Sequence, residues 1–178
     1  MQIRIHHAVF AALVLLPGVV AAQQANPVAD AFRDNAKEQG KNLIAAAEEF
    51  PADKFAYKPT PAQMSFGDIV VHLSQGNDYL CGSIAGVKAP TRAKVDHDDP
   101  KPALIARLRE TFAFCDQALA PLTDANLAEQ LPFFGGRKMS RASIMTLTTG
   151  DWADHYSQSA IYLRLNGLLP PTAKKPAQ

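Results

Sequence analysis

Apolar residues recur at steps of three and four along four segments of the chain, and this spacing places them on one face of an α-helix. No segment shows the alternation of apolar and polar residues that a half-buried strand requires. Four amphipathic helices of about 20 residues in one domain predict an all-α fold, a four-helix bundle. The predicted helices cover residues 27–50, 65–85, 99–120 and 140–166.

Local signals mark several helix ends. Ser65 is followed three residues later by Asp68, which predicts a capping box at the start of the second helix. Ser140 is the expected cap of the fourth helix, and Gly167 with the prolines behind it predicts where that helix ends. The segment TDANLAEQ predicts a short helical turn, and LPFFGGRKMS predicts either a loop or a small hairpin.

The chain divides into three parts. Residues 1–22 have a basic start, an apolar run and small residues before the expected cleavage point, as in a secretory signal peptide. The apolar run is short and contains a proline, so we expect cleavage and no stable membrane insertion afterwards. Residues 23–168 form the helical domain, and residues 169–178 are expected to be a flexible tail. The predicted location is periplasmic or secreted.

Composition narrows the partners. Lys and Arg number 18 against 17 Asp and Glu, so no basic footprint for nucleic acid is present. Cys81 and Cys115 would meet an oxidising compartment after export, where a disulfide persists. Two buried free thiols are the alternative. A homodimer is compatible with the sequence.

Candidate chemistry lies on the second and fourth helices. Asp151 and His155 are one turn apart on a face that otherwise packs inward, and a core carboxylate is costly unless it is paired or binds a metal. His72 lies at the edge of the core face of the second helix, and Gly76 one turn later leaves room beside it. Two imidazoles and one carboxylate form a ligand set for zinc or non-haem iron.

Simpler explanations exist for these residues and their neighbours. Asp151 can pair with Arg141 or Lys138 near the start of its helix, or with His155 at i, i+4 spacing. Asp154 is about 100° round the helix and is not expected to act as a base. Tyr156, Gln75 and Asn77 either contact the metal ligands or a substrate, or they are ordinary packing or solvated residues. The run HDDP at residues 97–100 imitates a metal cluster, but helix capping and the preference for acidic residues in a first turn explain it.

The chain resembles the DinB-like (YfiT-like) family over nearly all of its predicted mature part. The segments YKPTPAQMSFGDIVVHLSQGNDYLC, FGGRKMSRASIM and DHYSQSAIYLRLNGLLPP carry the resemblance. The family implies a four-helix bundle whose divalent metal is held by three histidines, one on the second helix and two on the last. His72 and His155 match the outer positions, whereas Asp151 replaces the middle histidine. Asp151 either still binds the metal or marks its loss, and Asp is a competent ligand.

The resemblance implies activities as well. Relatives include thiol-dependent transferases and isomerases, and others are described as metal-dependent hydrolases. Export disfavours a thiol-dependent reaction, because small thiol cofactors are mainly cytosolic. We therefore expect a divalent metal, zinc first and otherwise iron, nickel or manganese, that serves hydrolysis of a small-molecule substrate. The alternative is a non-catalytic exported bundle that has lost its metal and binds a small ligand or a partner.

Overall fold

The computed structural model describes residues 25–174. The predicted signal peptide, residues 1–22, lies outside the described residues. The expected helices are present, and three of the four begin and end within one residue of the prediction. The third begins two residues later than predicted, because Pro100 is its N-cap residue and has a non-helical backbone conformation. The helices are α1 (Pro27–Glu49), α2 (Phe66–Ala85), α3 (Lys101–Leu119) and α4 (Arg141–Leu165).

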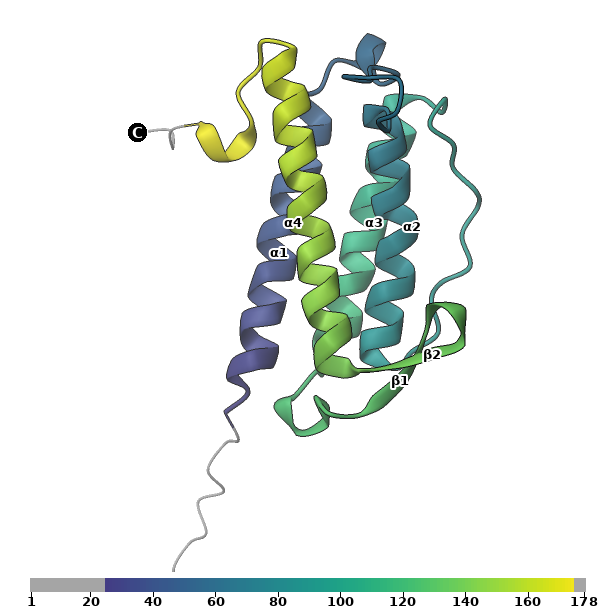
Figure 1. The fold of residues 1–178 in the computed structure, drawn as a ribbon, viewed down its shortest axis with the longest axis vertical. Coiled ribbons are helices and arrows are strands. Elements are labelled where there is room, and N and C mark those ends of the chain that lie inside the picture. Colours follow the sequence, from purple (N-terminus) through teal and green to yellow (C-terminus); the bar gives the residue numbers. More distant parts are fainter. Residues whose placement is uncertain (1–24, 175–178) are drawn as a thin grey trace, which may run out of the picture.

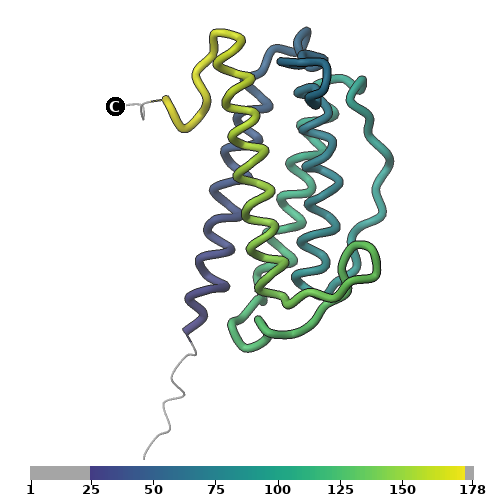
Figure 2. The backbone as a smooth tube through the Cα atoms, viewed as in Figure 1, coloured from purple at the N-terminus to yellow at the C-terminus, as the bar shows by residue number. Residues whose placement is uncertain are grey.

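The four helices pack as a bundle, which confirms the predicted fold (Figure 1). Helix α1 packs against α3 and α4, and α2 packs against the same two helices. The order around the bundle is therefore α1, α3, α2, α4, with α1 and α2 on opposite corners. The chain trace shows α1 and α4 running in one direction and α2 and α3 in the other (Figure 2). Residues 86–100 run back along the length of the bundle to join α2 to α3 (Figure 2).

The core is formed by the apolar stripes that the sequence predicts. On α3 the inner stripe of Leu104, Leu108, Phe112, Cys115 and Leu119 is buried. The single tryptophan, Trp152 of α4, is fully buried and its ring lies 5.9 Å from those of Phe32 and Phe112. A buried indole N–H needs an acceptor, and Trp152 Nε1 donates to Asn77 Oδ1 at 2.7 Å.

Capping fixes the helix ends. Ser65 and Asp68 form the predicted capping box, with the Asp68 amide bonded to Ser65 Oγ at 3.0 Å and the Ser65 amide bonded to Asp68 Oδ2 at 2.9 Å. Ser140 caps α4 as expected. Gly167 follows the end of α4 with a φ of 75°, a left-handed conformation that glycine adopts without strain.

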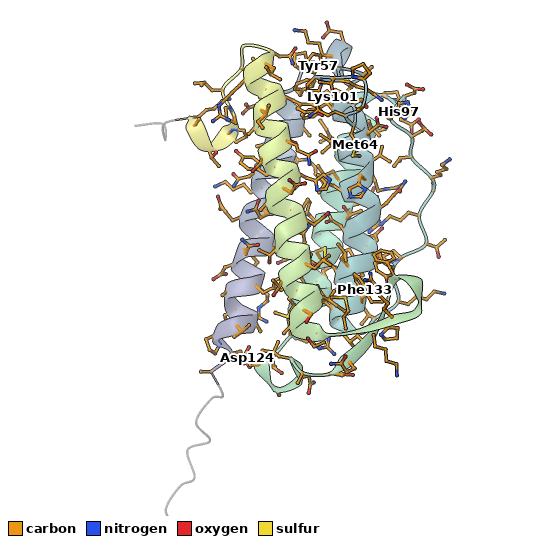
Figure 3. The ribbon with its side chains drawn as sticks, in the orientation of Figure 1. Tyr57, Met64, His97, Lys101, Asp124 and Phe133 are labelled. Atoms are coloured by element: carbon orange, nitrogen blue, oxygen red, sulfur yellow. A yellow bond between two sulfur atoms is a disulfide. The ribbon has the colours of Figure 1, made fainter. Side chains whose placement is uncertain are left out.

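Helix α1 is capped by side chains distant in sequence. The Asp124 carboxylate accepts hydrogen bonds from the amides of Val28 and Ala29, at 3.1 and 2.8 Å, and so satisfies two free donors of the first turn. Lys101 Nζ donates to the carbonyls of Glu48 and Phe50 at the other end. Figure 3 labels Asp124 and Lys101 at opposite ends of the bundle. Both contacts are favourable with respect to the dipole of α1, because the negative charge lies at its N-terminus and the positive charge at its C-terminus.

Between α3 and α4 the chain forms a short 3-10 turn, Asp124–Asn126, and then a hairpin. Strand β1 (Gln130–Phe133) pairs antiparallel with β2 (Arg137–Ser140). Of the two structures expected for this segment, a loop or a small hairpin, the chain therefore forms the hairpin. Cys81 and Cys115 form a disulfide that joins α2 to α3.

Part of the segment expected to be a flexible tail has defined contacts. Residues Pro171–Ala173 form a 3-10 turn. The Tyr156 hydroxyl donates to Thr172 Oγ1 at 2.8 Å, and Lys174 Nζ lies 2.6 Å from a carboxylate oxygen of Glu49. These contacts lay the chain against α4 and α1 as far as Lys174. Within residues 25–174, no helix has the length and apolar character needed to cross a membrane.

Candidate metal centre

The three predicted ligands meet where α2 packs against α4. His72 lies on α2, and Asp151 and His155 lie one turn apart on α4 and therefore on one face of it. One potential ligand atom from each residue lies within 4.8 Å of the other two. The packing of two antiparallel helices thus brings together side chains that are 79 and 83 residues apart in the sequence.

Asp151 is central to the cluster. Its Oδ1 lies 3.8 Å from His72 Nε2 and 3.5 Å from His155 Nδ1. Both distances exceed those of ordinary hydrogen bonds, so the carboxylate is not committed to either ring. The two imidazoles stack with their centroids 4.7 Å apart and an angle of 26° between their planes. The three potential ligand groups therefore lie close together without forming hydrogen bonds to one another.

The tautomer of His155 follows from its hydrogen bond. His155 Nδ1 lies 2.8 Å from the backbone carbonyl oxygen of Asp151. A carbonyl oxygen can only accept, so Nδ1 carries the proton and donates it. The lone pair of the neutral ring is then on Nε2, which becomes the ligand atom. Metal-binding histidines are commonly oriented by a hydrogen bond of this kind.

Burial is graded across the cluster. The exposed fraction is 9% for the side chain of His155, 23% for Asp151 and 50% for His72. The cluster is therefore anchored in the bundle at His155 and open to solvent at His72. A site with protein ligands on one side and solvent on the other resembles catalytic rather than closed structural metal sites.

The donor set fits a divalent ion. Zinc bonds of about 2.0–2.2 Å in a tetrahedral site place neighbouring ligand atoms about 3.4 Å apart. The separation of 3.8 Å between His72 Nε2 and Asp151 Oδ1 is close to that value. Two neutral imidazoles and one carboxylate leave a fourth position for water or substrate.

The simpler pairing of Asp151 with Arg141, at the start of α4, is not observed. The Arg141 guanidinium instead donates to Glu129 at 2.7 Å and to the carbonyl of Asn126 at 3.3 Å. Among residues 25–174, the ion-pair partners of Asp151 are the two histidines. Arg141 therefore ties the start of α4 to the chain ahead of the hairpin and is not available to the cluster.

Space lies beside the cluster, as the glycine at position 76 predicts. A methyl group built on Gly76 would meet no atom within 4 Å, and the same holds for Gly150, which precedes Asp151. Neither glycine is needed for close helix packing. The space next to Gly76, one turn from His72 on α2, is therefore not filled by a neighbouring helix or side chain.

The neighbouring polar residues have other roles. Asp154 is exposed and accepts a hydrogen bond from Gln158 at 2.7 Å, which agrees with its expected position away from the cluster. Asn77 is buried and bonds to Trp152, and Tyr156 bonds to Thr172. The packing interpretation therefore accounts for Asn77 and Tyr156.

The acidic run before α3 does not cap that helix, so the capping explanation was wrong. The N-cap of α3 is Pro100, and no side chain caps it. His97 Nδ1 instead lies 3.2 Å from an oxygen of Asp68, in the first turn of α2, and 3.0 Å from one of Asp96. Asp96, His97 and Asp98 are all exposed, and His97, labelled in Figure 3, links the chain before α3 to α2. Nothing in the local sequence signals this contact with Asp68, because it depends on how α2 and the 86–100 segment pack.

Two pKa shifts occur at this end of the bundle. Burial tends to raise the pKa of Asp68, but hydrogen bonds from the hydroxyl and amide of Ser65, with the charges of His97 and Lys58, hold it below its usual value. Burial chiefly raises the pKa of Tyr162. The protonated Tyr162 hydroxyl donates to the carbonyl of Met64 at 2.8 Å and so links α4 to the chain before α2.

Facing helices of a bundle can supply the ligands of a metal site, and here two histidines and a carboxylate meet between α2 and α4. A family model described as the DinB superfamily matches residues 36–159. Since this match spans well over half of the 178 residues, the chain belongs to the DinB superfamily.

Solved structures agree on the fold. A DinB-like protein from Bacillus subtilis has 19% identity and a TM-score of 0.64, over 82% of this chain and 99% of that one. A DinB-like protein from Bacillus cereus has 16% identity and a TM-score of 0.66, over 80% and 95% of the two chains. A conserved protein from Enterococcus faecalis has 12% identity and a TM-score of 0.61, over 78% and 95%. No curated protein matches the chain.

Proposed function

We propose that His72, Asp151 and His155 bind one divalent metal ion, with zinc as the first choice, and that this centre serves a hydrolytic reaction. The observation that carries the proposal is the convergence of three ligand atoms from α2 and α4 within 4.8 Å. Membership of the DinB superfamily supports it. The disulfide between Cys81 and Cys115 supports an exported location, where water is the available co-reactant.

The aspartate at the middle position changes the character of the centre. A carboxylate adds one negative charge where the family pattern has a neutral imidazole, so the site becomes harder and holds a divalent cation more strongly by charge. Zinc and iron both accept two imidazoles and one carboxylate, while nickel and manganese are further candidates. Asp151 remains accessible enough to bind, because neither histidine occupies its oxygens at hydrogen-bond distance.

The residues of the chain have distinct roles in this proposal. The carbonyl of Asp151 bonds to His155 Nδ1, so Nε2 is the atom of His155 that would bind an ion. His72, half exposed, forms the edge across which a substrate enters, beside the open space at Gly76. A bound divalent ion would supply Lewis-acid chemistry, by acidifying water or polarising a carbonyl. Asp154 faces away and takes no part.

A second candidate is a bundle that has lost its metal and binds a small ligand or partner without catalysis. The observation that favours it is the replacement of the middle histidine by Asp151. In this case the carboxylate would simply pair with His72 and His155, which lie 3.8 and 3.5 Å away. The two candidates make opposite predictions for metal content.

Metal analysis of untagged protein separates them. We expect close to one equivalent of a divalent metal per chain after purification, or after incubation with zinc, iron, manganese or nickel and removal of the excess. His72→Ala and Asp151→Ala should each lose it. Asp154→Ala is the matched control, since it removes a carboxylate three residues from Asp151 that lies outside the cluster. Only trace metal in the supplemented wild-type protein would refute the metal centre.

Thermal unfolding gives an independent readout. A ligand at about 100 times its Kd stabilises the native state by roughly 2.7 kcal/mol, so zinc should raise Tm and a chelator should reverse the rise. Asp151→His, which introduces the family residue, should keep this response, and Asp151→Ala should abolish it. Hydrolysis is tested on a panel of small esters, amides and lactones. Stoichiometric metal without chelator-sensitive turnover would keep the centre and overturn the hydrolase assignment.

A further inference from the structure

A cavity lies between α1 and α3. Helices α1 and α3 adjoin on the side of the bundle opposite to the α2–α4 contact that holds the candidate metal ligands. The cavity has a volume of about 260 Å³, and none of its lining residues belongs to the metal cluster. This volume is slightly below the roughly 300 Å³ at which pockets for drug-sized ligands begin, so it suits a small or slender molecule.

The shape of the cavity is long and its floor is apolar. Along α1 its lining extends from Arg33 to Ile44, twelve residues that span about 16 Å of helix. Ala36, Gly40 and Phe112 form part of the floor. Gly40 permits this floor, because a methyl group there would lie 2.8 Å from the Phe112 ring. A groove of this length with an apolar floor fits an extended alkyl chain better than a compact ring system.

Two arginines at the groove are already neutralised. Arg33 pairs with Asp30 and also donates to the carbonyl of Leu122 at 2.6 Å. Arg109 pairs with Glu48 across the two helices. These guanidinium groups are therefore held in place by their own partners, and they leave little charge for a ligand.

The lysines differ. Lys37 is 3.7 Å from Asp116, and both side chains are more than 60% exposed, so this pair is weak. Lys41, one turn further along α1, lines the groove and has no ion pair among residues 25–174. The groove thus carries one uncompensated positive charge above an apolar floor. Its charge complements a single carboxylate.

We propose that the α1–α3 groove binds a medium-chain fatty acid as its carboxylate. The alkyl chain lies on the apolar floor along α1, and the carboxylate contacts Lys41 and the neighbouring Lys37. This site is separate from the metal centre and does not depend on the proposed hydrolysis. It gives the protein a second ligand on the opposite side of the bundle.

Calorimetric titration with sodium decanoate, in a buffer containing a chelator, tests the proposal. We expect saturable binding of one decanoate per chain, unchanged by removal of metal. Decanol, which lacks the charge, should bind several-fold more weakly, and decyltrimethylammonium should not bind. Equal affinity for all three amphiphiles would show non-specific apolar adsorption and would overturn the proposal.

Two pairs of variants locate the site. Ala113→Trp places a large side chain at an exposed groove position, and we expect at least a tenfold loss of decanoate affinity. Gln117→Trp, one turn further along the same helix and outside the groove lining, is its control. Lys41→Glu should weaken decanoate about fivefold or more and leave decanol unchanged, because an exposed ion pair contributes modestly. Lys138→Glu on the hairpin is the charge-matched control.

Each pair is checked for unchanged thermal unfolding before the affinities are compared. Wild-type affinity in Ala113→Trp, or no saturable binding at millimolar decanoate, refutes the site. Sedimentation analysis addresses the competing occupant, a second copy of the chain. A dimer that Ala113→Trp dissociates and decanoate does not would assign the groove to self-association and overturn the fatty-acid proposal.

Discussion

Reduction of the disulfide offers the sharpest test of how the bundle is held together. Cys81 and Cys115 join the last turn and a half of α2 to the last turn and a half of α3, and both are buried. The two helices are parallel neighbours connected by the long 86–100 segment. The bond closes a large loop that is retained in the unfolded chain. Breaking the bond therefore increases the conformational entropy of the unfolded state and lowers the free energy of unfolding.

The sequence separation sets the magnitude. The bridged residues are 34 apart. The chain-entropy relation for a loop of that size gives about 12.6 cal/mol/K, or about 3.8 kcal/mol at 25 °C. Single domains have a free energy of unfolding of roughly 5–15 kcal/mol, so the loss is a large part of the total. For a domain of this size, we expect Tm to fall by roughly 8–16 °C.

Urea unfolding in the presence and absence of a phosphine reductant measures the difference. The double variant Cys81→Ala, Cys115→Ala is the control, because the reductant should have no effect on it. A change below about 1 kcal/mol on reduction of the wild-type protein would refute the reasoning. So would two reactive thiols in the unfolded, unreduced protein, because the bond would then be absent.

Two further predictions concern local features. Asp68→Asn should destabilise the protein at neutral pH by removing acceptors for the capping contacts of Ser65, by about 1 kcal/mol for the cap. Because the folded pKa of Asp68 is lowered, its contribution is fully present above the unfolded pKa of about 3.9 and is lost as pH falls through the folded value; the gap between wild type and variant in urea midpoints should therefore close at low pH, and an equal gap at pH 7 and pH 2 would contradict this. Gly40→Ala should destabilise by about 1–3 kcal/mol, because the new methyl meets the Phe112 ring at 2.8 Å. Gly76→Ala is its matched control and should stabilise by up to about 1 kcal/mol, since the methyl meets nothing and alanine favours helix; equal thermal shifts in the two variants would show that packing at Gly40 is not the cause.

The helices and most of their ends follow from the sequence for local reasons. The capping box of Ser65 and Asp68 and the stop at Gly167 depend on residues a few positions apart, and the structure has both. The inner stripe of α4, including Thr148, Asp151 and His155, follows from the helical period alone. The same period places His72 at the edge of the core face of α2, and the family resemblance implies the same residue as a ligand.

Local reasoning was insufficient where a contact spans the chain. Arg141 is close to Asp151 in sequence but bonds to Glu129, and His97 contacts Asp68 rather than capping α3. These outcomes depend on which segments lie side by side, and helical periodicity carries no information about that. The ordered contacts of the segment up to Lys174 have the same origin, because their partners are on α1 and α4.

The sequence by itself determined four amphipathic helices, their polar and apolar faces, and the three side chains able to bind a metal. Tertiary structure alone decided the order α1, α3, α2, α4 around the bundle, and with it the meeting of His72 with Asp151 and His155. It also decided the pairing of the cysteines and the groove between α1 and α3. The physical reason is range: propensity and capping act over a few residues, whereas these features arise from side-chain packing between helices far apart in the chain.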